Sequence, residues 1–339
     1  MTCNVPSPRF EDTPAGLVVR APAKVNLNLL VGPRRADGFH DLDSLVVKIS
    51  LYDELSIVPS EAITLTCAGA DCGEVESNLV YRAAMLLREH ALDRGWAAGE
   101  SLGARIHLVK RTPPGKGLGG GSSDAAAALL GLWRLWGLDR IASPSAEAAL
   151  SPLAAQLGSD VPLFLAPSAC RMTGRGEILQ PLDVAPMAMA LFLPDLFCAT
   201  PAVYRSFDSA RLPLLRSSNF AEQAELRRAS QLAAAPDAST APAALAERQL
   251  DAACLRLPPS RWRARLVNDL FPAAGRVCPE LADLQARIQS HTDIPILMTG
   301  SGSALFAPCD HRAEAARLLE SLPPDLQRHA TVVQTVTCE

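Results

Sequence analysis

Apolar and polar residues alternate clearly near the start of the chain. Between residues 24 and 31 every second side chain is apolar, and the positions between carry Lys24, Asn26 and Asn28. Successive side chains of a strand point to opposite faces, so this pattern predicts a strand with one apolar face. A shorter apolar run predicts a preceding strand over 17–22. The polar face of such a strand ordinarily contacts solvent, and we expect this of Asn28.

The same reasoning gives the remaining elements. Apolar runs predict further strands at 45–58, 63–67, 104–109, 161–165, 187–193, 294–298, 304–307 and 330–336. Helical spacing predicts helices at 78–90, 125–136, 145–157, 279–289 and 311–321. The first of these begins at Asn78, a good N-cap, and the third ends at Gly158. From residue 187 onward the order is β-α-β-β-α-β, which predicts a split βαβ sandwich.

Composition narrows the class of protein. The 339 residues suffice for two domains, and the net charge of −4 gives no sign of nucleic-acid binding. Nine cysteines occur without a C-x-x-C pair, and the histidines lack metal-ligand spacing. We therefore expect reduced thiols, a cytoplasmic location and no protein metal-ligand set. We also expect no membrane partner, because no apolar run approaches the length of a membrane span.

The strongest local signal is a glycine-rich stretch between the predicted strand 104–109 and helix 125–136. Five of the seven residues 115–121 are glycines, and Ser122, Ser123 and Asp124 follow. We expect a serine at the helix N-cap, the aspartate in the first turn, and the loop outside the hydrophobic core. Free backbone N–H groups and the helix dipole both favour an anion at such a loop. A flexible surface turn is the less favoured alternative.

Two common phosphate-binding patterns fit this stretch poorly. The P-loop requires a lysine where Gly121 stands. The dinucleotide pattern G-x-G-x-x-G is met by Gly115, Gly117 and Gly120, with Asp139 at about the expected distance. That fold, however, requires a second buried strand after the helix, and the residues after 136 are turn-like.

The pattern Pro-x-x-x-Gly-Leu-Gly-Gly-Gly-Ser-Ser-Asp-Ala-Ala instead resembles the phosphate loop of the galactokinase–homoserine–mevalonate–phosphomevalonate (GHMP) kinase superfamily. In this form it is similar to that of the 4-diphosphocytidyl-2-C-methyl-D-erythritol kinases. Three further stretches, Pro-Ala-Lys-Val-Asn-Leu at 22–27, Leu-Gly-Ser-Asp-Val-Pro-Leu-Phe at 157–164 and Met-Thr-Gly-Ser-Gly-Ser at 298–303, resemble the same family. The resemblance extends over nearly all of residues 17–336.

The resemblance implies an α+β fold of two domains. The first, residues 1–175, would be a ribosomal-protein-S5-like α/β domain that binds ATP. The second, residues 176–339, would be ferredoxin-like, with an Ala-, Arg-, Ser- and Pro-rich insertion at about 208–262.

The resemblance also implies roles for individual residues. Lys24 would lie beside the reacting hydroxyl and Asp160 would be the base, although a turn-capping aspartate is the alternative for Asp160. Phe39, where the family has tyrosine, would stack on a cytosine ring and His40 would hold the base edge. Asn26 and, less specifically, Thr200 would contact substrate. ATP would bind Pro113, Pro114, Gly115, Lys116, Gly117, Leu118, Gly119, Gly120, Gly121, Ser122 and Ser123.

The implied reaction is ATP-dependent phosphorylation of the 2-hydroxyl of 4-diphosphocytidyl-2-C-methyl-D-erythritol, a step of non-mevalonate isoprenoid synthesis. Mg²⁺ would accompany ATP, and the protein would be a monomer or weak homodimer. Two alternatives stay open at this point. One is a GHMP kinase for another small alcohol, of the homoserine or mevalonate type. The other is a non-catalytic sensor of the same fold that binds nucleotide.

Overall fold

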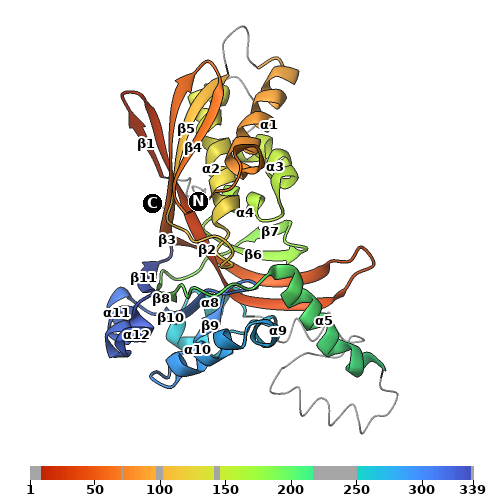
Figure 1. Ribbon diagram of the computed structural model, residues 1–339, viewed down its shortest axis with the longest axis vertical. Coiled ribbons are helices and arrows are strands. Elements are labelled where there is room, and N and C mark those ends of the chain that lie inside the picture. Colours follow the sequence, from red (N-terminus) through yellow and green to blue (C-terminus); the bar gives the residue numbers. More distant parts are fainter. Residues whose placement is uncertain (1–8, 71, 97–101, 141–145, 217–249, 337–339) are drawn as a thin grey trace.

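Two β-sheets, each covered by helices, form two lobes stacked along the long axis (Figure 1). The computed structural model describes residues 9–70, 72–96, 102–140, 146–216 and 250–336. Within these ranges no helix is long and apolar enough to cross a membrane.

The N-terminal sheet is organised around two very long antiparallel strands. β2 (Gly16–Arg34) joins the two strands expected at 17–22 and 24–31, and β3 (His40–Ser60) pairs along it with register shifts. The order is β1-β2-β3-β5-β4, with β6 also on β3 and β7 on β6. The remaining strands are β1 (Arg9–Thr13), β4 (Ile63–Gly69), β5 (Gly103–Lys110), β6 (Ala169–Gly174) and β7 (Ile178–Pro181).

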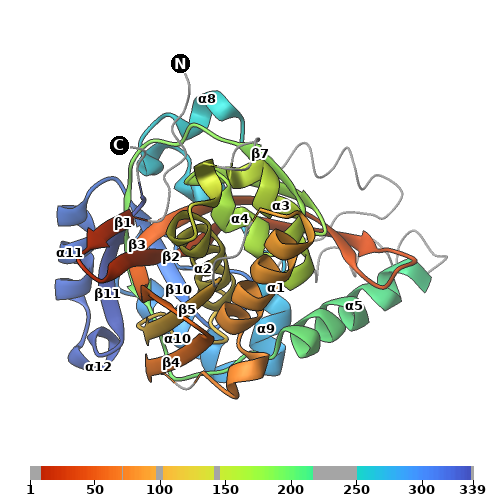
Figure 2. The same cartoon turned by 90° about the horizontal axis from the view of Figure 1, so that it is seen from above.

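Helices cover one face of this sheet (Figures 1 and 2). They are α1 (Leu79–Asp93), α2 (Gly120–Leu135), α3 (Ala146–Leu157) and α4 (Val161–Leu165), with short 3₁₀ turns η1 (Val75–Ser77) and η2 (Leu138–Arg140). Asn78 caps α1 as expected, because its side chain accepts a hydrogen bond from Val80 N. Buried leucines and alanines of these helices pack on Val19, Leu55 and Ile57 to form the lobe's core.

Two local predictions are wrong. The N-cap of α2 is Gly119, which has a left-handed backbone (φ 68°), so the cap lies three or four residues before the expected Ser122 or Ser123. Ser122 and Ser123 thus lie inside the helix, and Asp124 is buried beyond the first turn. Residues 161–165 form the short helix α4, not a strand. Pro162 suits the first turn of a helix, because the N–H groups of that turn have no intrahelical partner and proline lacks one.

The C-terminal sheet confirms the split βαβ order. Its strands are β8 (Ala188–Phe192), β9 (Leu297–Met298), β10 (Leu305–Cys309) and β11 (Ala330–Gln334), all paired antiparallel in the order β11-β8-β10-β9. The expected strand 294–298 is shorter than predicted. The other elements are α5 (Thr200–Arg216), α8 (Ala252–Leu255), η4 (Pro259–Arg261), η5 (Arg263–Arg265), α9 (Phe271–Val277), α10 (Pro279–Gln289), α11 (Arg312–Ser321) and α12 (Pro324–Gln327).

The two lobes share a core along β2. Val25 and Leu27, from the face predicted to be apolar, pack with Met189 and Leu191 of β8 and with Phe306 of β10. The predicted domain division between residues 175 and 176 falls in the turn between β6 and β7, which pair with each other, and it stays a prediction. Most of the predicted insertion, residues 217–249, lies outside the described residues; the flanking parts contain the end of α5, α8 and η4.

Gly131, where α2 packs closely against the sheet, provides a test of packing. A Cβ at Gly131 would lie 2.6 Å from Ile57 Cδ1 and 3.0 Å from Val19 Cγ2. Gly131→Val should therefore lower the free energy of unfolding by about 1–3 kcal/mol through overpacking. Gly121→Val on the same helix is the control, because the nearest atom to its Cβ is 3.7 Å away. Denaturant titration that gave equal stability for both variants would contradict this account.

Candidate active site

A cavity of about 1370 Å³ lies where the two lobes meet. It brings together residues that are far apart in the sequence. Ten of the residues predicted from sequence line it: Lys24, Asn26, Phe39, His40, Gly115, Gly117, Gly119, Ser122, Asp160 and Thr200. The other predicted loop residues are not in its lining, namely Pro113, Pro114, Lys116, Leu118, Gly120, Gly121 and Ser123.

The glycine-rich loop crosses the space between the lobes. Gly115, Gly117 and Gly119 all have φ near +70°, a conformation that favours glycine. The loop is held on both sides: Lys24 N donates to Leu118 O at 2.9 Å, and Ala304 N donates to Lys116 O at 3.2 Å. Leu118 itself is 1% exposed and belongs to the core between the lobes. The expectation that the whole loop lies outside the core is therefore wrong.

The side chain of Lys116 ties the loop to the C-terminal lobe. Its ammonium donates to the carbonyls of Pro194 and Leu196, so it is neither freely solvated nor in the cavity lining. The loop therefore offers the cavity backbone groups and the N-terminal end of α2. These favour an anion without any lysine charge.

Lys24 and Asp160 face the same cavity from different elements. Lys24 on β2 is buried, and its ammonium donates to Asn26 Oδ1. Burial lowers the pKa of Lys24, and the negative charge of Asp160 opposes that shift. Asp160 stands at the N-cap position of α4, but its side chain makes no capping hydrogen bond. Its carboxylate is therefore not used as a cap and is available to the cavity.

Asn26 is fixed by a network across the lobes. Its backbone N–H donates to Thr299 Oγ1 at 2.9 Å, and its side-chain amide nitrogen donates to Ser44 Oγ at 2.8 Å.

Asn28 is 3% exposed and accepts a hydrogen bond from Val267 N, so the expectation of a solvated side chain is wrong. The C-terminal lobe covers this part of β2 and supplies the partner. Thr200, at the start of α5, hydrogen-bonds Ser301 at the cavity wall.

The turn between β2 and β3 presents an aromatic ring. Gly38 has φ 86°, as the predicted tight turn requires, and Phe39 is 56% exposed with the Arg175 guanidinium 5.0 Å from its ring centroid. His40 is buried instead. Its Nδ1 lies 3.1 Å from Gly32 O and its Nε2 lies 3.2 Å from Asp208 Oδ1.

Sequence reasoning missed several residues of the cavity wall. Tyr204 and Asp208 lie on consecutive turns of α5, and the Tyr204 ring is 5.2 Å from that of His40. Burial, with a smaller effect of Asp160, raises the pKa of Tyr204 to about 12, so this phenol stays neutral. Their i, i+4 spacing was a usable signal, but only the fold shows that α5 faces the β2–β3 turn.

No group of three or more histidine, cysteine or acidic side chains in the described ranges could hold a metal ion. Mg²⁺ does not require such a group, because it commonly keeps several waters and binds substrate phosphates with one or two carboxylates.

Comparisons with known proteins agree with this geometry. Residues 78–167 match the family model "GHMP kinases N terminal domain", and residues 253–325 match "GHMP kinases C terminal". A 4-diphosphocytidyl-2-C-methyl-D-erythritol kinase of Symbiobacterium thermophilum is 37% identical over 93% of this chain and 98% of its own length. This chain belongs to that kinase family. ATP is accordingly its co-substrate.

Solved structures show the same relationship. The crystal structure of a 4-(cytidine 5'-diphospho)-2C-methyl-D-erythritol kinase is 32% identical to this chain and has a TM-score of 0.65. The match covers 94% of this chain and 100% of that one. L. major mevalonate kinase has a TM-score of 0.60 but only 14% identity, with 98% of both chains covered, so that likeness shows the fold alone. The predicted α+β GHMP kinase fold of two lobes is confirmed.

The loop geometry generates a test of nucleotide binding. At Gly119 (φ 68°) a Cβ would lie 2.9 Å from Phe164 Cζ, and at Gly120 it would lie 2.9 Å from Thr112 Cγ2. Valine at either position should abolish ATP binding measured by calorimetry. Gly137→Val is the control, because it has the same left-handed backbone in open space at the other end of α2. Unaltered ATP affinity in both loop variants, with folding checked by circular dichroism, would place the phosphates elsewhere.

Proposed function

We propose that this protein transfers the γ-phosphoryl group of ATP to the 2-hydroxyl of 4-diphosphocytidyl-2-C-methyl-D-erythritol, in the non-mevalonate pathway. The observation that carries this proposal is the single cavity lined by the glycine-rich loop, by Lys24 with Asp160, and by the Phe39–His40 turn. These three parts suit a triphosphate, a reacting hydroxyl and an aromatic base. The kinship with kinases of that name supplies the identity of the substrate.

Phosphoryl transfer requires positioning and charge neutralisation more than covalent chemistry. The loop's backbone N–H groups and the start of α2 would hold the phosphates. Asp160 would accept the hydroxyl proton, and the Lys24 ammonium would stabilise the developing alkoxide. Asn26 would keep the ammonium in place, because its side-chain amide donates to Ser44 Oγ and its backbone N–H donates to Thr299 Oγ1.

The base of the substrate would bind at the other end of the cavity. Phe39 can offer a ring face for stacking, and Tyr204 lines the same cavity beside His40. Both ring nitrogens of His40 already have partners, Gly32 O at Nδ1 and Asp208 at Nε2. A cytosine that bound the His40 ring at Nε2 would therefore have to displace the Asp208 carboxylate.

Three further assignments belong to the same proposal. Mg²⁺ would accompany ATP, held mainly by the phosphates. A reducing, cytoplasmic setting fits the seven described cysteines, all of which are free thiols. A monomer or weak homodimer without nucleic-acid partners fits the mildly acidic chain.

The alternatives separate in a simple assay. A homoserine- or mevalonate-type kinase shares the fold but would not require the Phe39–His40 turn as a base site. A non-catalytic sensor would bind nucleotide without turnover. ATP turnover measured with a panel of alcohols decides among them: activity confined to the cytidine-linked alcohol supports the proposal, and activity with homoserine or mevalonate alone, or with none, contradicts it.

Asp160 and Lys24 provide the test of the chemistry. Asp160→Asn keeps the shape but removes the proton acceptor, so kcat should fall by roughly 10²–10⁴ while ATP affinity barely changes. Lys24→Met should also lower kcat. The double variant should lose much less than the product of the single effects, since both residues act on one hydroxyl.

Asp251→Asn is the matched control for Asp160→Asn. It changes an N-cap aspartate whose side chain does cap its helix, by accepting from Cys254 N at 2.6 Å. Asn keeps the Oδ1 acceptor for that N–H, so this variant should stay folded and leave kcat unchanged. Full activity of Asp160→Asn, or strictly multiplicative losses in the Asp160/Lys24 double variant, would contradict a shared role at the hydroxyl.

Phe39 provides the test of the base site. Phe39→Ala should remove stacking worth roughly 1–3 kcal/mol, which raises KM for the cytidine-linked substrate and spares KM for ATP. Phe39→Tyr keeps the ring face and should be tolerated. Steady-state kinetics with unchanged substrate KM in Phe39→Ala would remove the support for a cytosine site at this turn.

A further inference from the structure

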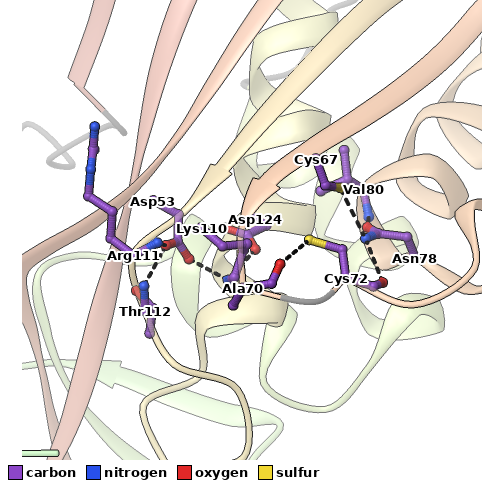
Figure 3. Close-up of polar contacts among 10 residues, drawn as sticks. All are labelled: Asp53, Cys67, Ala70, Cys72, Asn78, Val80, Lys110, Arg111, Thr112 and Asp124. Atoms are coloured by element: carbon purple, nitrogen blue, oxygen red, sulfur yellow. Dashed lines mark hydrogen bonds and ion pairs between the residues drawn. The ribbon is translucent and has the colours of Figure 1, made fainter.

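The buried carboxylate of Asp53 takes no part in the chemistry described above. It lies on β3 with 0% exposure, outside the cavity lining. Its Oδ1 accepts hydrogen bonds from Arg111 N at 2.6 Å and Thr112 N at 2.7 Å, and its Oδ2 accepts from the Lys110 ammonium (Figure 3). Burying a carboxylate is costly unless such donors surround it. Asp53 therefore fixes three consecutive residues just before the glycine-rich loop.

The Lys110 ammonium extends this contact to the far end of the loop. It also donates to Asp124 Oδ2 on α2 at 2.7 Å (Figure 3). Gly120 at the start of α2 lies so close that a Cβ there would be 2.9 Å from Thr112 Cγ2 and 3.1 Å from Lys110 Nζ. The chain entering the loop and the chain leaving it thus touch. We call Lys110, Thr112, Gly120 and Asp124 the loop neck.

The two carboxylates that accept hydrogen bonds from the Lys110 ammonium, Asp53 and Asp124, are not equivalent. Burial raises the pKa of Asp124 to about 8; the Lys110 charge opposes this shift, and the charge of Asp53 adds to it. Asp124 Oδ1 has no hydrogen-bond partner among the described residues, whereas Asp53 has three donors. Asp53 thus has the larger set of hydrogen-bond donors, and Asp124 is the weaker anchor.

We propose that Asp53 is a positioning residue for ATP binding, which holds the loop neck closed and so keeps the loop in its phosphate-binding shape. A loop already in that shape loses less conformational entropy when it binds phosphate. The inference rests on the proposed function only in assigning the loop to ATP. It concerns a carboxylate that lies outside the cavity lining.

The test uses the whole protein and the ATP analogue AMP-PNP with Mg²⁺. Asp53→Asn should weaken AMP-PNP binding, measured by calorimetry, at least about tenfold, because the carboxylate's charge-assisted hydrogen bonds are lost. It should also speed tryptic cleavage after Lys116, within the loop. Binding of cytidine 5′-diphosphate should not change. If the wild-type protein did not bind this compound, the proposed cytosine site would be contradicted, whereas the proposal for Asp53 would still be decided by AMP-PNP binding.

The control is Asp43→Asn on the same strand. Asp43 is also buried and pairs with Arg171 through two hydrogen bonds, of 3.0 and 2.6 Å, on β6 rather than at the loop. It should leave AMP-PNP affinity and the cleavage rate after Lys116 unchanged. An equal loss in this variant would overturn the proposal, because any broken ion pair on β3 would then suffice.

A second variant covers the case in which Asp53→Asn does not fold. Asp53→Glu keeps the charge that Lys110 needs but displaces the carboxylate from the N–H groups of Arg111 and Thr112. It should show the same two effects, weaker AMP-PNP binding and faster cleavage after Lys116, to a smaller degree. Wild-type affinity and cleavage in a folded Asp53→Asn, or in Asp53→Glu, would overturn the proposal.

Discussion

The burial of β2 on both faces is the constraint on which the rest of the structure depends. One face packs on the C-terminal sheet through Val25 and Leu27, and the other carries Lys24, Asn26 and Asn28, all nearly inaccessible to solvent. A polar side chain removed from water is stable only where it finds a partner. The active site is the place where that requirement is met by groups from both lobes.

The partners come from distant parts of the chain. The backbone N–H of Asn26 binds Thr299, and the amide oxygen of Asn28 binds Val267 N, both in the C-terminal lobe. Lys48 on β3 is similarly buried and donates to the carbonyls of Phe164 and Ala166 around α4. Each such bond stabilises the fold and also fixes an element that lines the cavity. Stability and positioning are therefore achieved by the same contacts.

The glycine-rich loop follows the same logic. A loop that presents backbone N–H groups to an anion cannot use those groups to hold itself in place. The structure instead fixes it from outside, by the Lys24 N–H, by the Lys116 side chain and by Asp53 at the neck. Glycines allow the close approach, since a Cβ at Gly117 would lie 2.3 Å from Thr299 O. The backbone N–H groups that we propose bind the phosphates are therefore not needed to anchor the loop, because other groups hold it in place.

The sequence by itself determined the elements whose signals are local. The alternation around Lys24, the cap at Asn78, the glycine run and the β-α-β-β-α-β order of the second lobe all depend on neighbours a few residues apart. Tertiary structure decided the rest. The burial of Asn28, the helical state of residues 161–165, the pairing of His40 with Asp208 and the role of Asp53 each depend on a partner from a distant element. A residue's type limits which bonds it can make, but only the fold determines which partner lies within reach.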